Sequence, residues 1–265
     1  TKKKSFIRET FKFYNYSAIN KIHPTYVQRM LSDTRHEKKN YMQILKNLKS
    51  QDAKKFNPFK LILSSNIYSQ NPKADWQPVS SFKDKEILIV GSGNSVQNNI
   101  KKVTNFIKKK NLMVIVLNTF NRIPEDLINF RVVCHPLRII SDSYFYKKSK
   151  TTLISPYSML DEKLKSLLNF KNKLILDFGL KIDKNGKIKI ERNYFQFSQP
   201  LAAAYAVGAS ISGEAKNIYL AGFDGFKKND PRRDDTFEFF KKLKKFKKNV
   251  SIKFITKTSY NIIFN

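Results

Sequence analysis

Two glycine-rich turns carry most of the residues that could do chemistry in this chain. Six of the eight glycines fall in two places, with Gly91 and Gly93 in the first turn and four more at 208–225. In a chain this poor in glycine, such clusters indicate backbone that turns sharply or approaches a ligand closely. Asn94 and Ser95 follow at the start of a predicted helix, where free backbone N–H groups suit a phosphate. The alternative is an ordinary N-cap formed by Asn94 or Ser95.

The first turn does not match the common nucleotide fingerprints. A dinucleotide motif needs a third glycine where Val96 stands, and an acidic residue where Asn118 ends the next apolar run. No Gly-Lys-Ser/Thr follows, so a Walker phosphate loop is absent as well. NAD binding and ATP hydrolysis are therefore poor fits, which leaves a ligand with a phosphate and a polar base or sugar.

Further polar residues stand at the ends of later apolar runs. His135 ends the third run, either as a site residue or as a structural histidine. Ser198 and Gln199 precede a small-residue helix whose first N–H groups suit a phosphate oxygen or a carboxylate. Gly222 and Asp224 follow the last central run, where Asp224 either binds a sugar hydroxyl or amine or only shapes a turn.

Metal ligands are scarce. Three histidines and a single cysteine, Cys134, are too few for a soft metal site. A single cysteine also excludes an internal disulfide. Asp234 and Asp235 are adjacent on a predicted helix, so their side chains diverge. The sequence therefore predicts neither a metal nor a cofactor.

The elements that must position these residues begin at Glu86. Predicted strands cover 86–90, 112–117, 131–134, 152–155, 173–178, 187–191, 217–224 and 251–256, and predicted helices cover 96–109, 124–127, 159–168, 200–215 and 232–248. The turn at 183–186 predicts a hairpin between the strands on its two sides. The alternation of strand and helix predicts an α/β, Rossmann-like, mostly parallel sheet with helices on both faces. Ligands of such sheets bind beyond the carboxyl ends of the strands.

Residues 1–83 read differently from residues 84–265. The first part contains short amphipathic segments with apolar residues at helical spacing, and it predicts a helical N-terminal segment. The polar stretch 64–84, with two prolines and Trp76, predicts a linker that lies on the second part. Residues 84–265 form the predicted Rossmann-like domain, which the family resemblance described below makes a nucleotide-sugar-binding domain.

The net charge of +30 favours an anionic partner, or reflects a coding bias toward lysine. Only nine of the 51 basic residues are arginine, which speaks against nucleic acid because readers of phosphates and base edges favour arginine. A membrane surface or an anionic substrate remains. The sequence has no run of about 18 apolar residues and no signal peptide, so it predicts a cytoplasmic protein or one at the inner face of the membrane.

The predicted helix 232–248 has an apolar stripe between lysines. Phe237, Phe240, Leu243 and Phe246 form this stripe. It either faces the core or lies on a membrane surface.

Several motifs, taken in order, resemble a known family. The segments V-G-S-G-N-S, L-N-T-F-N, C-H-P and I-Y-L-A-G-F-D-G-F within residues 86–256 resemble bacterial sialyltransferases of the Campylobacter type (glycosyltransferase family 42) and the sialyltransferase-like domains of surface-polysaccharide loci. The resemblance implies a CMP-activated nonulosonic or ulosonic acid as donor, a surface glycan or glycolipid as acceptor, as in lipopolysaccharide or capsule synthesis, and inverting, metal-independent transfer. The nucleotide would contact Gly91, Gly93, Asn94, Ser95, Asn118, His135, Ser198, Gln199, Gly222 and Asp224.

This chain also departs from the family pattern. The family's histidine base is missing, since no histidine follows His135, and Phe226 stands where the family has a tyrosine that assists the leaving phosphate. His135 itself occupies the place of an asparagine. The base would then be Asp230 or Asp234, with His135 as a weaker choice.

Two other functions and one wider context stay open. A non-catalytic nucleotide-binding module would explain the missing base, and a pterin-type diphosphokinase shares the glycine turn but needs Mg²⁺. Residues 20–34 resemble the tail of aldolase-like barrel proteins that carry such a domain. This implies the C-terminal part of an aldolase–glycosyltransferase fusion.

Overall fold

The computed structural model describes the predicted sheet domain and a short stretch before it. The described residues are 72–135, 138–139, 142–160, 162–183, 187–226, 231–246, 250–260, 262 and 264. The predicted N-terminal helices and the aldolase-like stretch 20–34 lie outside the described residues, as does Asp230.

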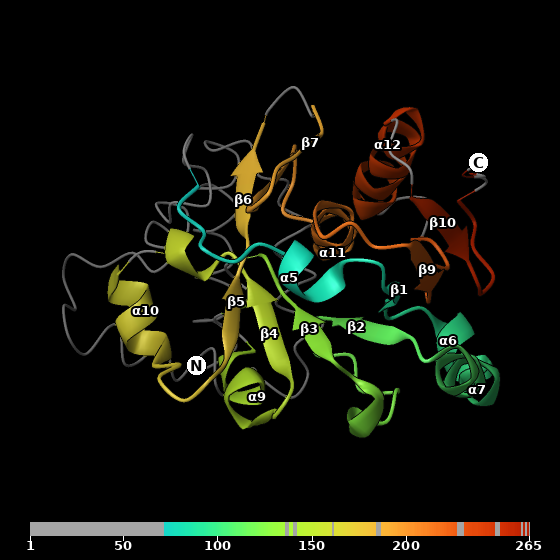
Figure 1. Cartoon of the computed structure of the whole chain (residues 1–265), viewed down its shortest axis with the longest axis horizontal. Coiled ribbons are helices and arrows are strands. Elements are labelled where there is room, and N and C mark those ends of the chain that lie inside the picture. The colour runs from blue at the N-terminus through green and yellow to red at the C-terminus, as the bar shows by residue number, and fades with distance from the viewer. Residues whose placement is uncertain are drawn as a thin grey trace, which may run out of the picture.

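Seven strands form one sheet at the centre of the domain (Figure 1). They are β1 (Glu86–Val90), β2 (Met113–Leu117), β3 (Phe130–Val132), β4 (Thr152–Ser155), β5 (Ile175–Asp177), β9 (Asn217–Ala221) and β10 (Ser251–Phe254). Their order across the sheet is β10-β9-β1-β2-β3-β4-β5, and every pairing is parallel. The predicted α/β, Rossmann-like fold is therefore confirmed.

Helices cover both faces of this sheet. The α-helices are α5 (Val79–Phe82), α6 (Asn94–Asn98), α7 (Ile100–Lys110), α9 (Ser143–Lys148), α10 (Glu162–Leu168), α11 (Ala202–Ser212) and α12 (Pro231–Lys245), and the 3-10 turns are η2 (Glu125–Leu127) and η3 (Tyr157–Met159). The predicted single helix 96–109 is two helices, because the backbone of Asn99 leaves the helical conformation at φ −122°, ψ 24°.

Side chains of the central strands alternate between two apolar layers. Leu88 and Val90 of β1 pack in a layer with Val103 and Ile107 of α7. Their neighbours on the same strand, such as Ile87, pack in the larger layer under α11. Because both faces are buried, these strands read as continuous apolar runs rather than as alternating ones.

The predicted hairpin around 183–186 is wrong. Two strands do lie before and after this turn, β6 (Gly179–Ile182) and β7 (Lys189–Ile190). Both pair with a third strand, β8 (Tyr194–Phe197), which lies between them in a small separate sheet. Pairing of β6 and β7 with β8 replaces the predicted direct pairing of the strands on the two sides of residues 183–186.

The described part of the predicted linker packs against the domain. Phe82 of α5 is fully buried, and Trp76 makes edge-on ring contacts with Phe82 and Phe178 at centroid distances of 5.4 and 6.2 Å. The backbone N–H of Trp76 also donates to the carbonyl of Asp177 at 3.2 Å. Residues 72–84 thus lie on the second part, as expected.

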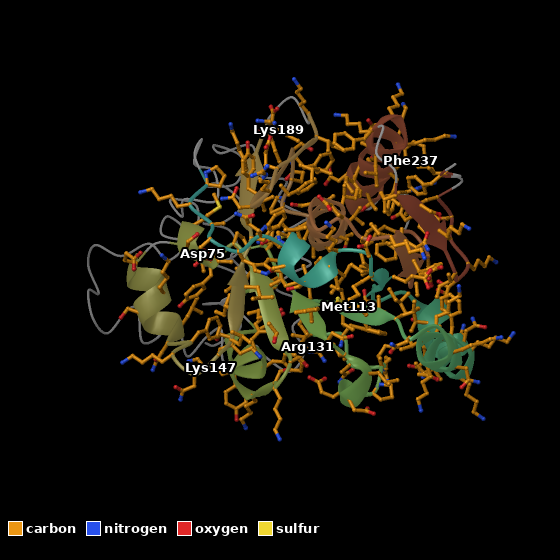
Figure 2. The ribbon with its side chains drawn as sticks, in the orientation of Figure 1. Asp75, Met113, Arg131, Lys147, Lys189 and Phe237 are labelled. Carbon is orange, nitrogen blue, oxygen red and sulfur yellow. The ribbon has the colours of Figure 1, made fainter. Side chains whose placement is uncertain are left out.

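The apolar stripe of α12 differs from the predicted one. Phe239 and Phe240 are fully buried and Leu243 nearly so, whereas Phe237 is 41% exposed (Figure 2). The buried positions follow the spacing i, i+1, i+4, so the core-facing stripe passes through Phe239 and not Phe237. Among the helices that the structure describes, none has the length and apolar character to cross a membrane.

Candidate functional site

The two glycine-rich turns meet where the strand order reverses. From β1 the chain moves outward through β2, β3, β4 and β5, and it returns to the other side of β1 as β9 and β10. Open α/β sheets bind their ligands at such a switch point, beyond the carboxyl ends of the strands. Gly91 follows β1 at this edge and Gly222 follows β9.

The glycines allow the two turns to touch. The N–H of Gly91 donates to the carbonyl of Ala221 at 2.8 Å, and the N–H of Gly93 donates to the carbonyl of Gly222 at 2.9 Å. A Cβ atom at Gly93 would lie only 2.6 Å from the Gly222 oxygen, and Gly222 has a φ of +74°. Both positions therefore require glycine, one for close approach and the other for its left-handed conformation.

A carboxylate from the second turn caps the first helix. The N–H of Ser95 donates to Asp224 Oδ2 at 2.8 Å, and the Ser95 hydroxyl donates to Oδ1. Gly93 is the N-cap of α6, and no side chain within the helix start bonds its N–H groups. Neither Asn94 nor Ser95 is the capping side chain, because Asp224 supplies the cap from a distant loop.

This contact leaves Asp224 with further capacity to bind. Asp224 is half-buried, and each oxygen of an ionised carboxylate has more than one lone pair. The N–H groups of Gly93 and Ser95 are already bonded within the chain. A ligand at this turn would therefore meet Asn94, which is exposed, and the free side of the carboxylate.

Thr256 completes the network, and no sequence argument singled it out. Its Oγ1 accepts a hydrogen bond from the Gly222 N–H at 2.9 Å and lies 2.9 Å from the Ser95 hydroxyl oxygen. The available signal was its position as the first polar residue after the last apolar run, the same position that marked Asn118 and Asp224. The ends of β1, β9 and β10 are thus joined by side-chain hydrogen bonds.

Asn118 lies at the same edge on the β2 side. Its φ of +52° is a left-handed conformation that asparagine tolerates better than most residues. Its N–H donates to the carbonyl of Val132 at 2.8 Å. No hydrogen bond between Asn118 and the two glycine turns is present among the described residues, so a ligand would have to bridge them.

A buried arginine fixes the loop that follows Asn118. Arg131 of β3 is fully buried, and its Nη1 donates to the carbonyl of Phe120 at 2.8 Å (Figure 2). Its Nη2 lies 2.5 Å from Glu125 Oε2. Burial alone would raise the pKa of Glu125, but hydrogen bonds from Arg131, Thr151 and Ser149 outweigh it and lower that pKa from 4.5 to about 2. A charged residue within an otherwise apolar run was the sequence signal for this cluster.

His135 is buried beyond the end of β3. Burial, together with the nearby charge of Arg138, lowers its pKa from 6.5 to about 3. The imidazole is therefore neutral at physiological pH. Efficient general bases have a pKa near the working pH, so this environment favours a hydrogen-bonding role over proton transfer.

The remaining predicted residues that the structure describes lie in two different settings. Ser198 and Gln199 are half-buried between β8 and α11. Because the far end of α11 leads into β9, its N-terminal end faces the carboxyl edge of the sheet. Asp234 is exposed in the first turn of α12. Among the described residues, no group of three histidine, cysteine, aspartate or glutamate side chains could hold a metal ion.

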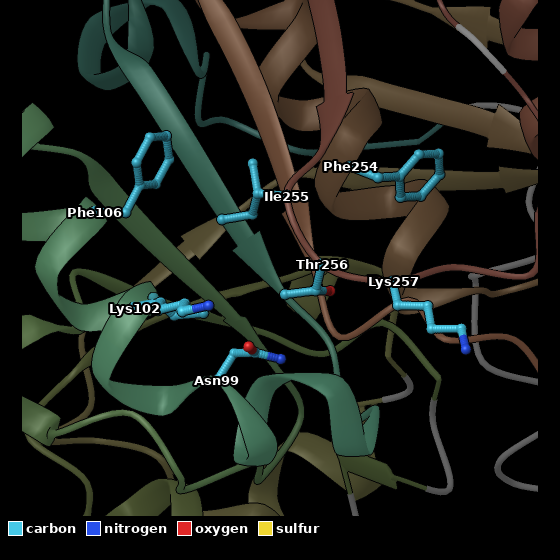
Figure 3. Close-up of a pocket in the computed structure, with 8 residues that line it drawn as sticks. Asn99, Lys102, Phe106, Phe254, Ile255, Thr256 and Lys257 are labelled. Carbon is cyan, nitrogen blue, oxygen red and sulfur yellow. The ribbon is translucent and has the colours of Figure 1, made fainter.

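An open pocket of about 560 Å³ adjoins the network (Figure 3). It lies between the first turns of α7, with Asn99, Lys102 and Phe106, and the segment after β10, with Ile255 and Thr256. Its volume is typical of sites for small ligands. Thr256 belongs both to this pocket and to the hydrogen-bond network of Asp224.

Comparison with known proteins finds similarity to solved structures. A scan against models of protein families finds no match, and a search of curated proteins finds none either. Among solved structures, the chain is similar to the MAf glycosyltransferase from Magnetospirillum magneticum AMB-1, with a TM-score of 0.42 and 15% sequence identity. The similarity covers 64% of this chain and 28% of that chain. It is too loose to carry a functional residue over to this protein.

Proposed function

We propose that this protein is a glycosyltransferase that moves a sialic-acid-like sugar, a nonulosonic or ulosonic acid, from a CMP-activated donor to a surface glycan or glycolipid, without a metal ion. The observation that carries the proposal is the meeting of the two glycine turns, with Ser95 and Asp224 bonded, at the switch point of the sheet. Nucleotide ligands of α/β proteins bind at this place. The order of the sequence motifs supports the cytidine nucleotide.

The side chains that remain available for binding support the following arrangement of the donor. The phosphate lies at the turn beside Asn94, and the cytidine extends toward Asn118 at the end of β2. The free lone pairs of Asp224 accept a hydrogen bond from a ribose or sugar hydroxyl. Ser198 and Gln199, at the N-terminal end of α11, face the same edge and contribute to the phosphate or the cytosine.

The transfer step needs charge stabilisation and a base. The acceptor oxygen bonds to the anomeric carbon, the bond from that carbon to the phosphate oxygen breaks, and CMP leaves. The N-terminal end of α11 and lysines stabilise the negative charge of the departing phosphate, because Asp224 already caps the start of α6. A carboxylate, Asp230 or Asp234, takes the proton of the acceptor hydroxyl, while neutral His135 serves as a hydrogen-bonding partner.

One observation favours a second candidate, a non-catalytic nucleotide-binding module. The N–H groups of Gly93 and Ser95, which a phosphate would use, are bonded to Gly222 and Asp224. Because the Asp224 carboxylate already binds the Ser95 N–H, the turn suits a domain that binds a nucleotide loosely and does not catalyse its reaction.

Nucleotide binding and turnover separate these candidates. The melting temperature is measured with CMP, CDP, ATP and NAD, each with and without Mg²⁺. Stabilisation by CMP that does not depend on Mg²⁺ is expected, and Asn118→Ala should abolish it while Asn121→Ala, an exposed neighbour, should not. No response to any cytidine nucleotide would contradict the proposed transferase, and no response to any of the four nucleotides would contradict the binding module as well. Release of CMP from a CMP-sugar, lost in Asp234→Ala or Asp230→Ala, then distinguishes the transferase from the module.

The proposal includes a cytoplasmic protein that touches the inner face of the membrane. Phe237 on α12 is exposed beside Lys241, Lys244 and Lys245. An exposed aromatic ring among lysines suits the boundary of an anionic bilayer, where lysines attract the lipid headgroups.

A further inference from the structure

The pocket between α7 and the segment after β10 has a fixed apolar wall. Val103 is buried in the layer of β1 and β2, and Ile255 packs against the same layer. The ring of Phe106 meets that of Tyr219 edge-on at a centroid distance of 5.1 Å. These contacts hold Phe106 against the core, so the wall exists before any ligand binds.

Apart from this wall and Phe254, the side chains that line the pocket are polar or positively charged. The Asn99 side-chain amide donates to the carbonyl of Ser95 at 2.9 Å, and Thr256 lies beside it. Lys102 and Lys257 come from two different segments, and both are exposed. Neither lysine forms an ion pair with another residue in the part of the chain that the structure describes. Two uncompensated ammonium groups beside an apolar wall favour an occupant that carries a negative charge and an apolar face.

The position of the pocket relative to the two glycine turns indicates which substrate it could bind. Along the carboxyl edge of the sheet, Asn118 follows β2, the glycine turns follow β1 and β9, and the pocket follows β10. Asn118 and the wall of the pocket that follows β10 therefore lie on opposite sides of the turns. If the donor phosphate lies at the turn and the cytidine at Asn118, the pocket is on the side left for the acceptor.

We infer that this pocket binds an acidic saccharide, and that this saccharide is the acceptor of the transferred sugar. Its carboxylate or phosphate pairs with Lys102 and Lys257, and its ring packs against Phe106. Thr256 and Asn99 connect the pocket directly to Ser95 in the donor turn. The role of this saccharide as acceptor rests on the proposed function. Its binding rests on the side chains of the pocket alone.

Titration of the full chain with one trisaccharide and one disaccharide tests whether the pocket binds an acidic sugar. Dissociation constants are measured for 3′-sialyllactose, which is anionic, and for lactose, which is not. The wild type should bind 3′-sialyllactose more tightly, and Lys102→Gln/Lys257→Gln should weaken that binding about tenfold or more, because charge-assisted hydrogen bonds are lost. Lys108→Gln/Lys109→Gln removes the same charge from exposed positions at the other end of α7 and should leave binding unchanged. Equal loss in both double variants, or no preference for the anionic probe, would overturn the inference.

Donor kinetics separate the acceptor from the donor sugar. Hydrolysis of a CMP-sugar without acceptor should show the same KM in Lys102→Gln/Lys257→Gln as in the wild type. A raised KM would mean that the pocket holds the carboxylate of the donor, which contradicts the acceptor assignment. If CMP fails to stabilise the protein, the proposed function and the acceptor role fail together, while the saccharide titration still decides whether the pocket binds an acidic sugar.

Discussion

The carboxylate of Asp224 accepts a hydrogen bond from the backbone N–H of Ser95 at 2.8 Å, although the two residues are 129 positions apart. This contact places a negative charge at the start of α6 and joins the loops that follow β1 and β9. The sequence suggested Asp224 as a ligand contact, and the structure gives it a structural role as well. Asp224 caps the helix and keeps lone pairs for a ligand, so the two roles do not exclude each other.

Asp224→Ala should lower the free energy of unfolding by about 1–2 kcal/mol, because α6 loses its cap and the Ser95 hydroxyl loses its acceptor. Asp224→Asn should cost less, since its amide oxygen can still accept from the Ser95 N–H. Urea denaturation measures both. Asp126→Ala, at an exposed position, serves as the control with a change within about 0.5 kcal/mol.

Gly93→Ala should destabilise the protein by about 1–3 kcal/mol, because the new Cβ would meet the Asp224 carboxylate and the Gly222 carbonyl oxygen. In an Asp224→Ala background the cost of Gly93→Ala should be smaller, since one of the two obstacles is gone. A double-mutant cycle by urea denaturation measures this coupling, and additive costs would contradict it. Ser92→Ala, an exposed neighbour, should have little effect.

Glu125→Gln should change how stability depends on pH in the acid range. The folded-state pKa of Glu125, about 2, lies below the ordinary value of 4.5, so its ionised form stabilises the fold above pH 4.5. This contribution is lost as the pH falls from 4.5 toward 2. The stability difference between wild type and Glu125→Gln should therefore be largest near pH 6 and shrink toward pH 3. Glu162→Gln, at an exposed position, should give curves parallel to the wild type.

His135→Asn should make the folding stability less dependent on pH between pH 7 and pH 4. The unfolded chain takes up a proton below the ordinary histidine pKa of 6.5, whereas the folded protein does so only near 3. Wild-type stability should thus fall as the pH drops from 6.5, on the order of 1 kcal/mol per pH unit. The asparagine variant lacks this loss, and thermal melts between pH 7 and pH 4 measure the difference. Parallel curves would mean that His135 is not held neutral.

Phe237→Ser should weaken binding to vesicles that contain phosphatidylserine by about 1 kcal/mol, or roughly fivefold, because one partly inserted ring is lost. Co-sedimentation at low and high salt measures it, and higher salt should weaken binding in both proteins. Tyr144→Ser removes another exposed aromatic ring, on α9, and should have no effect. An equal loss in both variants would contradict the membrane role of α12.

The sequence predicted the central sheet well because its strands are locally encoded. The predicted strand 152–155 coincides with β4, and the predicted strand 217–224 begins together with β9 at Asn217, although β9 already ends at Ala221. The buried small-residue helix at 200–215 is α11. Apolar periodicity and glycine positions are properties of neighbouring residues, so they can be read without knowing what packs where.

The predictions that were wrong or missing concern which strands pair and which side chains pack against each other. The turn at 183–186 indicated a hairpin, but β8 lies between the two flanking strands. The predicted apolar stripe of α12 includes Phe237 and either faces the core or lies on a membrane surface, but the buried side of the helix contains Phe239, and Phe237 is exposed. Arg131 was treated as part of an apolar strand, although its guanidinium is buried against Glu125 and a loop carbonyl.

The sequence by itself determined that polar residues stand at the ends of apolar runs, and parallel strands bring such ends to one edge. Only the tertiary structure decided that β9 lies beside β1, which sets Asp224 against Ser95 and Thr256 against both. The physical reason is that strand order depends on long-range packing, whereas hydrophobic pattern and turn chemistry are local. The sequence therefore indicated where a ligand would bind, and the fold determined which hydrogen-bond donors are already bonded within the protein.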